Sequence, residues 1–218
     1  MADLARRHNV VCRVGFNLRY STAASRAKAI LKDPSFGVNR HGIFRYGLCS
    51  GATLEHAVLD QHCHLVDLAA FLMGPVEGVT VIRSAIPDAR DYVCALKFRS
   101  GAVGTLNFTQ GQIIDKEFIY FEVTGDGSFL YSHGCAQLVW KRSGKGKWWK
   151  TPEPDQVYDR GWYGERLGLQ TMGYLADVDN FLGAVKGEVE DVCPVSDTVS
   201  TMETVEEMIR QIREKSDG

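Results

Sequence analysis

The sequence predicts an α+β fold, in which helices cover one face of an open, mostly antiparallel β-sheet. First, seven short segments of strand-like composition follow one another between residues 79 and 150. Second, several of the links between them have hairpin length, so neighbouring strands run antiparallel. Third, helical patterns lie before and after this region, and the order helix, sheet, helix favours helices packed on one sheet face.

The first expected elements are a short helix over residues 2–8 and a strand over residues 10–14. The strand is predicted by the β-branched run that follows the helix at once. A helix that leads directly into an apolar strand resembles the back half of a βαβ unit. Since a parallel strand needs neighbours, either this strand pairs elsewhere or the chain begins partway through a parent domain.

The next elements follow from caps and periodicity. Ser21-Thr22 is a plausible N-cap for an alanine-rich helix that Pro34 and Gly37 close. Residues 41–46 are expected to form a strand, and residues 58–73 a helix that stops at Gly74-Pro75. The strand-like segments are residues 79–85, 92–98, 103–109, 118–124, 128–131, 137–140 and 147–150.

A loop over residues 152–168 is expected after the sheet, and two amphipathic helices follow it over residues 172–185 and 196–214. Their apolar stripes are Tyr174, Val178, Phe181 and Val185 in the first, and Val199, Met202, Val205 and Ile209 in the second. The loop carries aromatic and arginine side chains that could flank a sugar pocket, form an interface or anchor in the core. They are Tyr158, Arg160, Trp162, Tyr163 and Arg166.

Composition excludes some classes of function. The net charge of −2 provides no basic surplus for binding phosphates, so a nucleic-acid partner is not expected. The most apolar stretch, residues 65–81, is too interrupted to span a bilayer. The six cysteines are scattered without metal-site spacing, and no leader sequence is visible. We therefore expect free thiols, no membrane partner and a cytoplasmic location.

The densest group of chemically capable side chains lies in the helix expected at residues 58–73. Asp60, His64 and Asp67 fall at positions i, i+4 and i+7, roughly opposite the apolar stripe. A histidine flanked by carboxylates is a sensible acid/base centre, because a carboxylate fixes the ring tautomer and raises its basicity. The alternatives are a solvated polar face, or a metal site that also uses His56 and His62. On a helix, however, His62 and His64 point about 200° apart.

Several motifs occur in one order along the chain. They are VGFNLRY at residues 14–20, DQHCHLVDL at residues 60–68, FLMG at residues 71–74, GAVGTL at residues 101–106, FEVTGDGS at residues 121–128 and DVDNF at residues 177–181. Together they resemble the glucose–fructose oxidoreductase/inositol dehydrogenase/MocA (Gfo/Idh/MocA) family. In that family a VGFN-x-R-[FY] hinge closes the Rossmann domain, and a D-x-x-x-H-x-x-D-L helix follows in the substrate domain. The family's glycine turn is one residue longer than the turn here.

The resemblance implies the fold, the chemistry and the site. The fold is the C-terminal domain of the dihydrodipicolinate-reductase-like type, and the substrate is a sugar, polyol or inositol-like molecule oxidised at a CH–OH group. The cofactor is NAD or NADP. His64, with Asp60, is expected at the substrate to assist proton transfer, while Asn17, Arg19 and Tyr20 lie near the junction of cofactor and substrate. Members commonly associate through the open sheet face, so a homo-oligomer is expected.

The sequence departs from the family pattern in its first residues. It has neither the glycine fingerprint nor the E-K-P segment whose lysine works with the histidine. Glycine-loop amides and a helix N-terminus are what bind pyrophosphate, so we expect no cofactor-binding or metal-binding residues in this chain. Residues 1–16 are interpreted as a remnant of a Rossmann domain, and residues 17–218 as a substrate-binding and oligomerisation domain.

Three hypotheses about function follow. The first is the substrate-side domain of an NAD(P)-dependent dehydrogenase, not catalytically competent alone. The second is a non-catalytic oligomerising or ligand-binding module derived from such an enzyme. The third is a metal-dependent hydrolase built on the histidines between His56 and His64.

Overall fold

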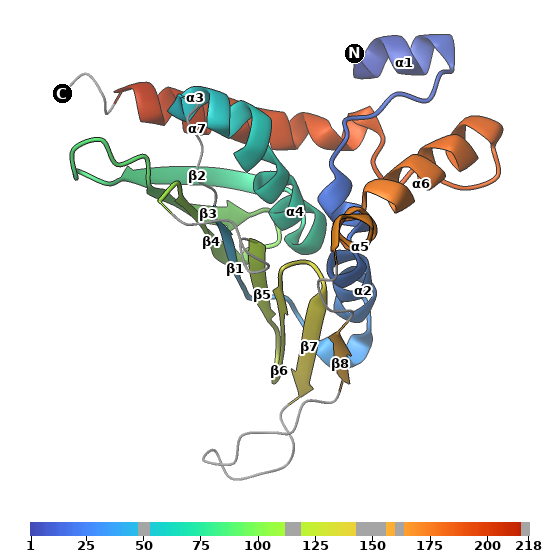
Figure 1. Ribbon diagram of the computed structural model, residues 1–218, viewed down its shortest axis with the longest axis horizontal. Coiled ribbons are helices and arrows are strands. Elements are labelled where there is room, and N and C mark those ends of the chain that lie inside the picture. Colours follow the sequence, from blue (N-terminus) through green and yellow to red (C-terminus); the bar gives the residue numbers. More distant parts are fainter. Residues whose placement is uncertain (48–52, 112–118, 143–155, 160–163, 215–218) are drawn as a thin grey trace.

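The structure is a computed structural model that describes residues 1–47, 53–111, 119–142, 156–159 and 164–214. Within these ranges one eight-stranded sheet has the order β2-β3-β4-β1-β5-β6-β7-β8 (Figure 1). Its strands are β1 (His41–Gly47), β2 (Val76–Arg83), β3 (Tyr92–Phe98), β4 (Val103–Thr109), β5 (Ile119–Thr124), β6 (Ser128–His133), β7 (Gln137–Arg142) and β8 (Gln156–Asp159). The pair β1–β4 is parallel, and the other neighbours in this order are antiparallel. The predicted fold class is confirmed.

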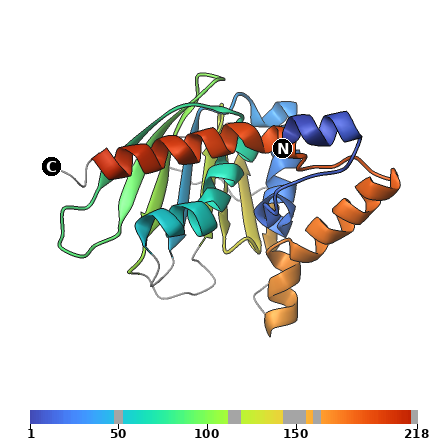
Figure 2. The ribbon, with the colours of Figure 1, turned by 90° about the horizontal axis from the view of Figure 1, so that it is seen from above.

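Helices gather on one face of the sheet (Figures 1 and 2). The helices are α1 (Ala2–His8), α2 (Thr22–Leu31), α3 (Leu54–Ala57), α4 (Cys63–Met73), α5 (Gly164–Thr171), α6 (Tyr174–Lys186) and α7 (Val199–Glu214). Four short turns join them: η1 (Asn17–Tyr20), η2 (Pro34–Phe36), the π-turn η3 (Val58–His62) and η4 (Val195–Thr198). Helix α4 contacts α2, α7, η1 and β1, so it lies inside the core.

The strands form where side chains alternate between a buried and an exposed face. In β3, four buried residues alternate with three exposed ones, and the buried set faces the helices. In β5 and β6, buried residues alternate with half-buried ones. The predicted strands at 92–98 and 103–109 are confirmed to the residue, and the others shift by one to three residues at their ends. The strand predicted at residues 147–150 lies outside the described residues.

The strand predicted at residues 10–14 is wrong. This segment is extended but joins no sheet, and its one bridge pairs Arg13 with Pro194. The helix before it is present as α1, which stands away from the sheet (Figure 1). The physical reason is that a strand needs a neighbour along its whole length, and the described residues offer it only the loop around Pro194.

One further expectation needs correction in the C-terminal third. The segment predicted as a loop over residues 152–168 contains β8, which pairs with β7, and the beginning of α5. Helix α6 forms as predicted, but none of its residues is buried. Its apolar positions Tyr174, Val178 and Val185 stay about half exposed, at 47%, 53% and 56%.

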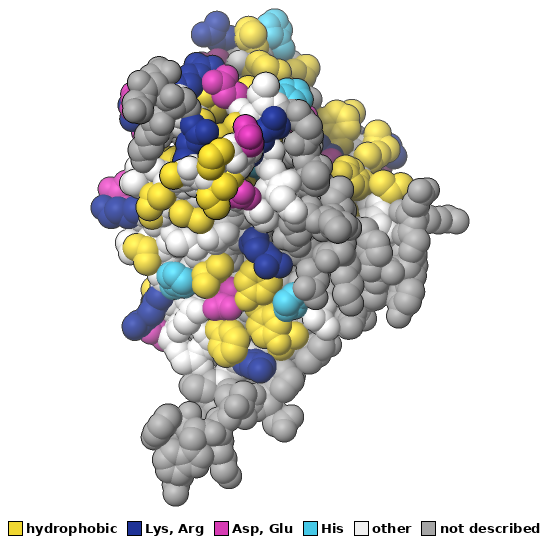
Figure 3. Space-filling model, turned by 60° about the vertical axis from the view of Figure 1, so that its left-hand side comes forward, with side chains coloured by type: hydrophobic (Ala, Val, Ile, Leu, Met, Phe, Trp, Pro, Cys, Tyr) yellow, Lys and Arg dark blue, Asp and Glu magenta, His cyan; other side chains and the backbone are white. Residues whose placement is uncertain are grey.

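The sheet face turned away from the helices mixes apolar, aromatic and charged groups, as Figure 3 shows from that side. Side chains of β5 and β6 form an aromatic group on it, in which the His133 ring lies 5.2 Å from Tyr120 and 5.6 Å from Tyr131. The aliphatic Ile82 on β2 and Val103 on β4 are 60% and 51% exposed. Across the described ranges, no helix combines the length and apolar character needed to cross a membrane.

Candidate functional site

The candidate site is carried by one continuous helical segment, α3–η3–α4. Thr53 begins it, because its Oγ1 accepts a hydrogen bond from the backbone N–H of His56 at 3.3 Å. The segment ends at Gly74, whose φ of 94° stops the helix. The π-turn η3 inserts an extra residue between the two α-helical parts. Such turns are rare in proteins, but those that occur are often found at functional sites. Here the turn ends at His62, close to His64, and the side chains of these two residues have different surroundings.

His62 faces the sheet and is fully buried. Its ring stacks on Phe108 at 4.4 Å between centroids, and its Nδ1 lies 2.7 Å from the Tyr92 hydroxyl. Tyr46 meets the ring edge-on at 5.8 Å. Burial lowers the pKa of His62 to about 4, so the ring is neutral at physiological pH. His62 is therefore a core residue and does not share a site with His64.

The burial of His62 makes stability depend on pH. Because the unfolded chain takes up a proton near pH 6.5 and the folded chain resists it down to about pH 4, stability is lost as the pH falls through this window. The expected loss is about 3 kcal/mol. It is measured by urea unfolding across the window. In His62→Phe, the free energy of unfolding should depend less steeply on pH than in the unchanged protein. In His8→Phe, at an exposed position, the dependence should stay as steep. Equal slopes in all three proteins would contradict the assignment.

His64 lies on the other side of the segment. Its ring meets Phe16 edge-on at 5.6 Å, and its Nδ1 is buried without a hydrogen-bond partner among the residues that the structure describes. Gln61, three residues earlier, has a buried Oε1 that also lacks a hydrogen-bond partner within the described ranges. Asp60 is exposed and makes no hydrogen bond to His64. Burial lowers the pKa of His64, and the charge of Asp60 opposes this effect.

Asp67 does not line the same face, contrary to the predicted arrangement. It is fully buried, and Arg19 binds it with two hydrogen bonds, from Nε at 2.7 Å and from an Nη at 2.6 Å. Thr201 donates a further hydrogen bond at 3.3 Å. The reason is that α4 is enclosed by its neighbours and has no continuous solvent face beyond His64. Asp67 therefore ties α4 to the hinge instead of serving as an acid or base.

The three predicted junction residues are also engaged within the protein. Asn17 is buried and donates from Nδ2 to the carbonyl of Met172 at 2.9 Å. The Tyr20 hydroxyl donates to Asn180 at 3.0 Å and accepts from Arg13 at 3.0 Å. With Arg19 on Asp67, these contacts hold η1 against α4 and α6. The geometry supports a positioning role for all three.

Sequence reasoning missed Arg13. Its side chain is 7% exposed, forms an ion pair with Asp177 at 2.7 Å and lies 4.9 Å from the Phe181 ring centroid. An arginine inside a β-branched run is the signal that could have found it, because a cation in an apolar segment needs a buried acidic partner. The same signal applies to Asp67 within the run LVDLAA.

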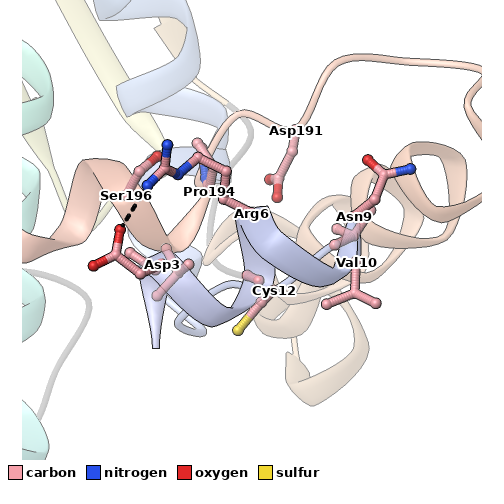
Figure 4. Close-up of a pocket in the computed structure, with 12 residues that line it drawn as sticks. Asp3, Arg6, Asn9, Val10, Cys12, Asp191, Pro194 and Ser196 are labelled. Atoms are coloured by element: carbon pink, nitrogen blue, oxygen red, sulfur yellow. Dashed lines mark hydrogen bonds and ion pairs between the residues drawn. The ribbon is translucent and has the colours of Figure 1, made fainter.

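A separate hollow lies between α1 and residues 191–196 (Figure 4). Asp3 and Arg6 line it and pair with each other at 3.1 Å, and Val10 and Cys12 also line it. It contains no residue of the candidate site. The five described cysteines are free thiols, as expected. In the part of the chain that the structure describes, no three His, Cys, Asp or Glu side chains gather as metal ligands would.

The sequence of residues 56–217 matches the Gfo/Idh/MocA family model described as "Oxidoreductase family, C-terminal alpha/beta domain". No curated protein sequence matches the chain. Solved structures do match its fold. A dehydrogenase from Chromobacterium violaceum has a TM-score of 0.79 at 17% identity, over 95% of this chain and 63% of that one.

Two other similar structures have known ligands or assignments in their descriptions. Levoglucosan dehydrogenase in complex with NADH and L-sorbose has a TM-score of 0.76 at 16% identity, over 97% of this chain and 66% of that one. A putative myo-inositol dehydrogenase from Sinorhizobium meliloti 1021 has a TM-score of 0.72 at 16% identity, over 98% and 66%. This chain therefore spans just under two thirds of the length of these proteins. At such identities the similarity establishes the fold.

Proposed function

Because the chain belongs to the Gfo/Idh/MocA oxidoreductase family, we propose that it is the substrate-side domain of an NAD(P)-dependent dehydrogenase. Its substrate class is a sugar, polyol or inositol-like molecule with a CH–OH group to be oxidised. The observation that carries the proposal is that two buried polar atoms of this helical segment, His64 Nδ1 and Gln61 Oε1, have no hydrogen-bond partner among the described residues. An unpaired buried polar group costs about 1–3 kcal/mol, which a ligand hydroxyl relieves.

The proposed role of His64 is to accept a proton from the substrate hydroxyl. Burial lowers the pKa of its ring, so at neutral pH the imidazole keeps a free lone pair for that proton. The negative charge of Asp60 favours the imidazolium once it forms. Asn17, Arg19 and Tyr20 position the hinge beside this histidine through their protein contacts.

The described residues do not fit a nicotinamide dinucleotide. The sequence has no glycine fingerprint to hold pyrophosphate, and the polar groups of the hinge residues are already engaged by the protein. When bound, such a cofactor supplies the hydride acceptor. We propose that residues 1–16 are a remnant of the nucleotide-binding domain, and that the chain is not catalytically competent alone. The half-exposed apolar positions of α6 support this, because a further domain would cover them.

We also propose that the protein is a cytoplasmic homo-oligomer. The exposed aliphatic and half-buried aromatic groups of the open sheet face support a homo-oligomer through that face. The free thiols support a reducing compartment such as the cytoplasm. The second candidate function is a non-catalytic oligomerising or ligand-binding module, favoured by the lack of a hydrogen bond between Asp60 and His64.

Saturation-transfer NMR tests the sugar site directly. The 218-residue chain is titrated with levoglucosan, L-sorbose and myo-inositol. At least one should bind, and His64→Ala should weaken it by about three- to tenfold, as expected for the loss of one hydrogen bond. His8→Ala, on exposed α1, is the matched control. Absence of binding by all three sugars, with an oligomer still present in sedimentation, would favour the non-catalytic module.

A further inference from the structure

Besides the hollow beside α1, a cavity with several charged lining residues lies next to the hinge, between α2, the end of α4 and the beginning of α7. Its volume is about 600 Å³, which is within the range of small-molecule sites. All of its lining residues belong to the described part of the chain, and the cationic ones come from α2, the hinge and the turn after β3. These are Lys28, Arg19 and Arg99.

Lys28 is held at the wall of this cavity in a half-buried position. Its ammonium group donates to the backbone carbonyl of Phe71 and lies 5.1 Å from the centroid of that ring. No carboxylate of the described chain pairs with it. Burial lowers the pKa of Lys28, and the positive charges of Lys32 and Arg19 add to that effect. An anion in the cavity would relieve this cost.

Arg99 supplies the second available cation. Its backbone N–H donates to Pro75, which places the residue at the link between α4 and β2, and its exposed guanidinium has no partner among the described residues. Arg19 lies at the same cavity, but Asp67 already neutralises it. Lys28 and Arg99 are therefore the two positive charges left for a ligand.

The wall formed by η4 and α7 has the opposite character. Ser196, Ser200, Asp197 and Glu203 line it, and the Glu203 carboxylate has no partner among the described residues. Carboxylates accept hydrogen bonds from hydroxyl or ammonium groups. They also repel a second negative charge, so a dianionic phosphate is disfavoured between the walls.

This cavity is distinct from the His64 site. Phe71 lies seven residues beyond His64 on the regular helix α4, a rise of about 10 Å along its axis. Neither His64 nor Gln61 lines the cavity. Asp67, which forms the buried ion pair with Arg19, lies between His64 and Phe71 along α4.

We propose that this cavity binds a small carboxylate that carries hydrogen-bond donors on its other groups. The ligand carboxylate binds between Lys28 and Arg99, and its hydroxyl or ammonium groups donate to Asp197 and Glu203. A hydroxy acid and an amino acid share this chemistry, and the experiment separates them.

Calorimetric titration of the 218-residue chain tests the site with sodium D-gluconate and with L-threonine. Neutral D-sorbitol and inorganic phosphate are the comparison ligands. One of the two carboxylates should bind saturably and more tightly than sorbitol or phosphate, and the tighter one identifies the donor type. Arg99→Gln, at an exposed position that should not disturb folding, is expected to weaken it by about tenfold or more, as for a lost charge-assisted hydrogen bond.

The controls separate this site from the proposed sugar site. Arg7→Gln, an exposed arginine on α1, and His64→Ala should both leave carboxylate binding unchanged. Lys28→Gln should reproduce the loss seen in Arg99→Gln. The proposal is overturned if neither carboxylate binds, if phosphate binds as tightly as they do, or if His64→Ala abolishes binding that Arg99→Gln preserves.

Discussion

Replacing Arg19 with methionine is expected to lower the free energy of unfolding by about 3–5 kcal/mol, because it leaves the buried Asp67 carboxylate without its charge partner. The two side chains are joined at 2.6 and 2.7 Å, and Asp67 is fully shielded from solvent. The remaining donor, Thr201 at 3.3 Å, cannot neutralise the charge. Urea unfolding followed by circular dichroism measures the loss.

Two further variants make this test specific. The double variant Arg19→Met/Asp67→Leu should recover most of the stability, because an apolar pair of similar volume needs no charge compensation. Arg213 also binds a carboxylate with two hydrogen bonds, to Glu55 at 2.8 Å each, but at the surface. Arg213→Met is therefore expected to change stability little. If Arg19→Met cost no more than Arg213→Met, the buried pair would not hold the hinge.

Gly173→Ala is expected to destabilise the protein by about 2–5 kcal/mol, the sum of a strained backbone and a steric overlap. Gly173 has a φ of 89°, and an added Cβ would lie 2.3 Å from the backbone oxygen of Asn17 and 2.5 Å from the backbone nitrogen of Ser21. These are backbone atoms of the hinge, so they cannot rotate away. The position lets the beginning of α6 approach η1 closely.

Gly187 provides the matched control for this prediction. It has a similar φ of 75° at the end of α6, but an added Cβ would meet nothing within 4 Å. Gly187→Ala should therefore show the backbone strain alone, about 1–2 kcal/mol. Thermal and urea unfolding of both variants measure the difference. Equal losses would mean that the close approach of α6 to the hinge contributes nothing.

The sheet could be predicted from sequence because its strands alternate buried and exposed residues over their whole length, as β3 and β4 do. The structure of residues 10–14 could not be predicted in this way, because their β-branched composition does not tell whether a neighbouring strand is available for pairing. Strand β8 was missed because proline, aspartate and glycine residues around it are typical of loops. Pairing with β7 determines its structure.

The site was predicted at the level of the helix and less well at the level of side chains. A regular helical repeat places Asp60, His64 and Asp67 together, but tertiary packing encloses α4 and makes Asp67 a buried partner of Arg19. The divergence of His62 from His64 does follow from helical spacing, and the structure places the two rings in separate surroundings. The π-turn that ends at His62 has no recognisable signal in the sequence.

The central proposal is that this chain carries the substrate side of a dehydrogenase and not the site for its nucleotide. Calorimetric titration of the 218-residue chain with NADH and NADPH tests this most directly, with and without the sugar that binds it best. The account predicts saturable heat for the sugar and none for either nucleotide. Saturable binding of NADH or NADPH in the micromolar range would contradict it.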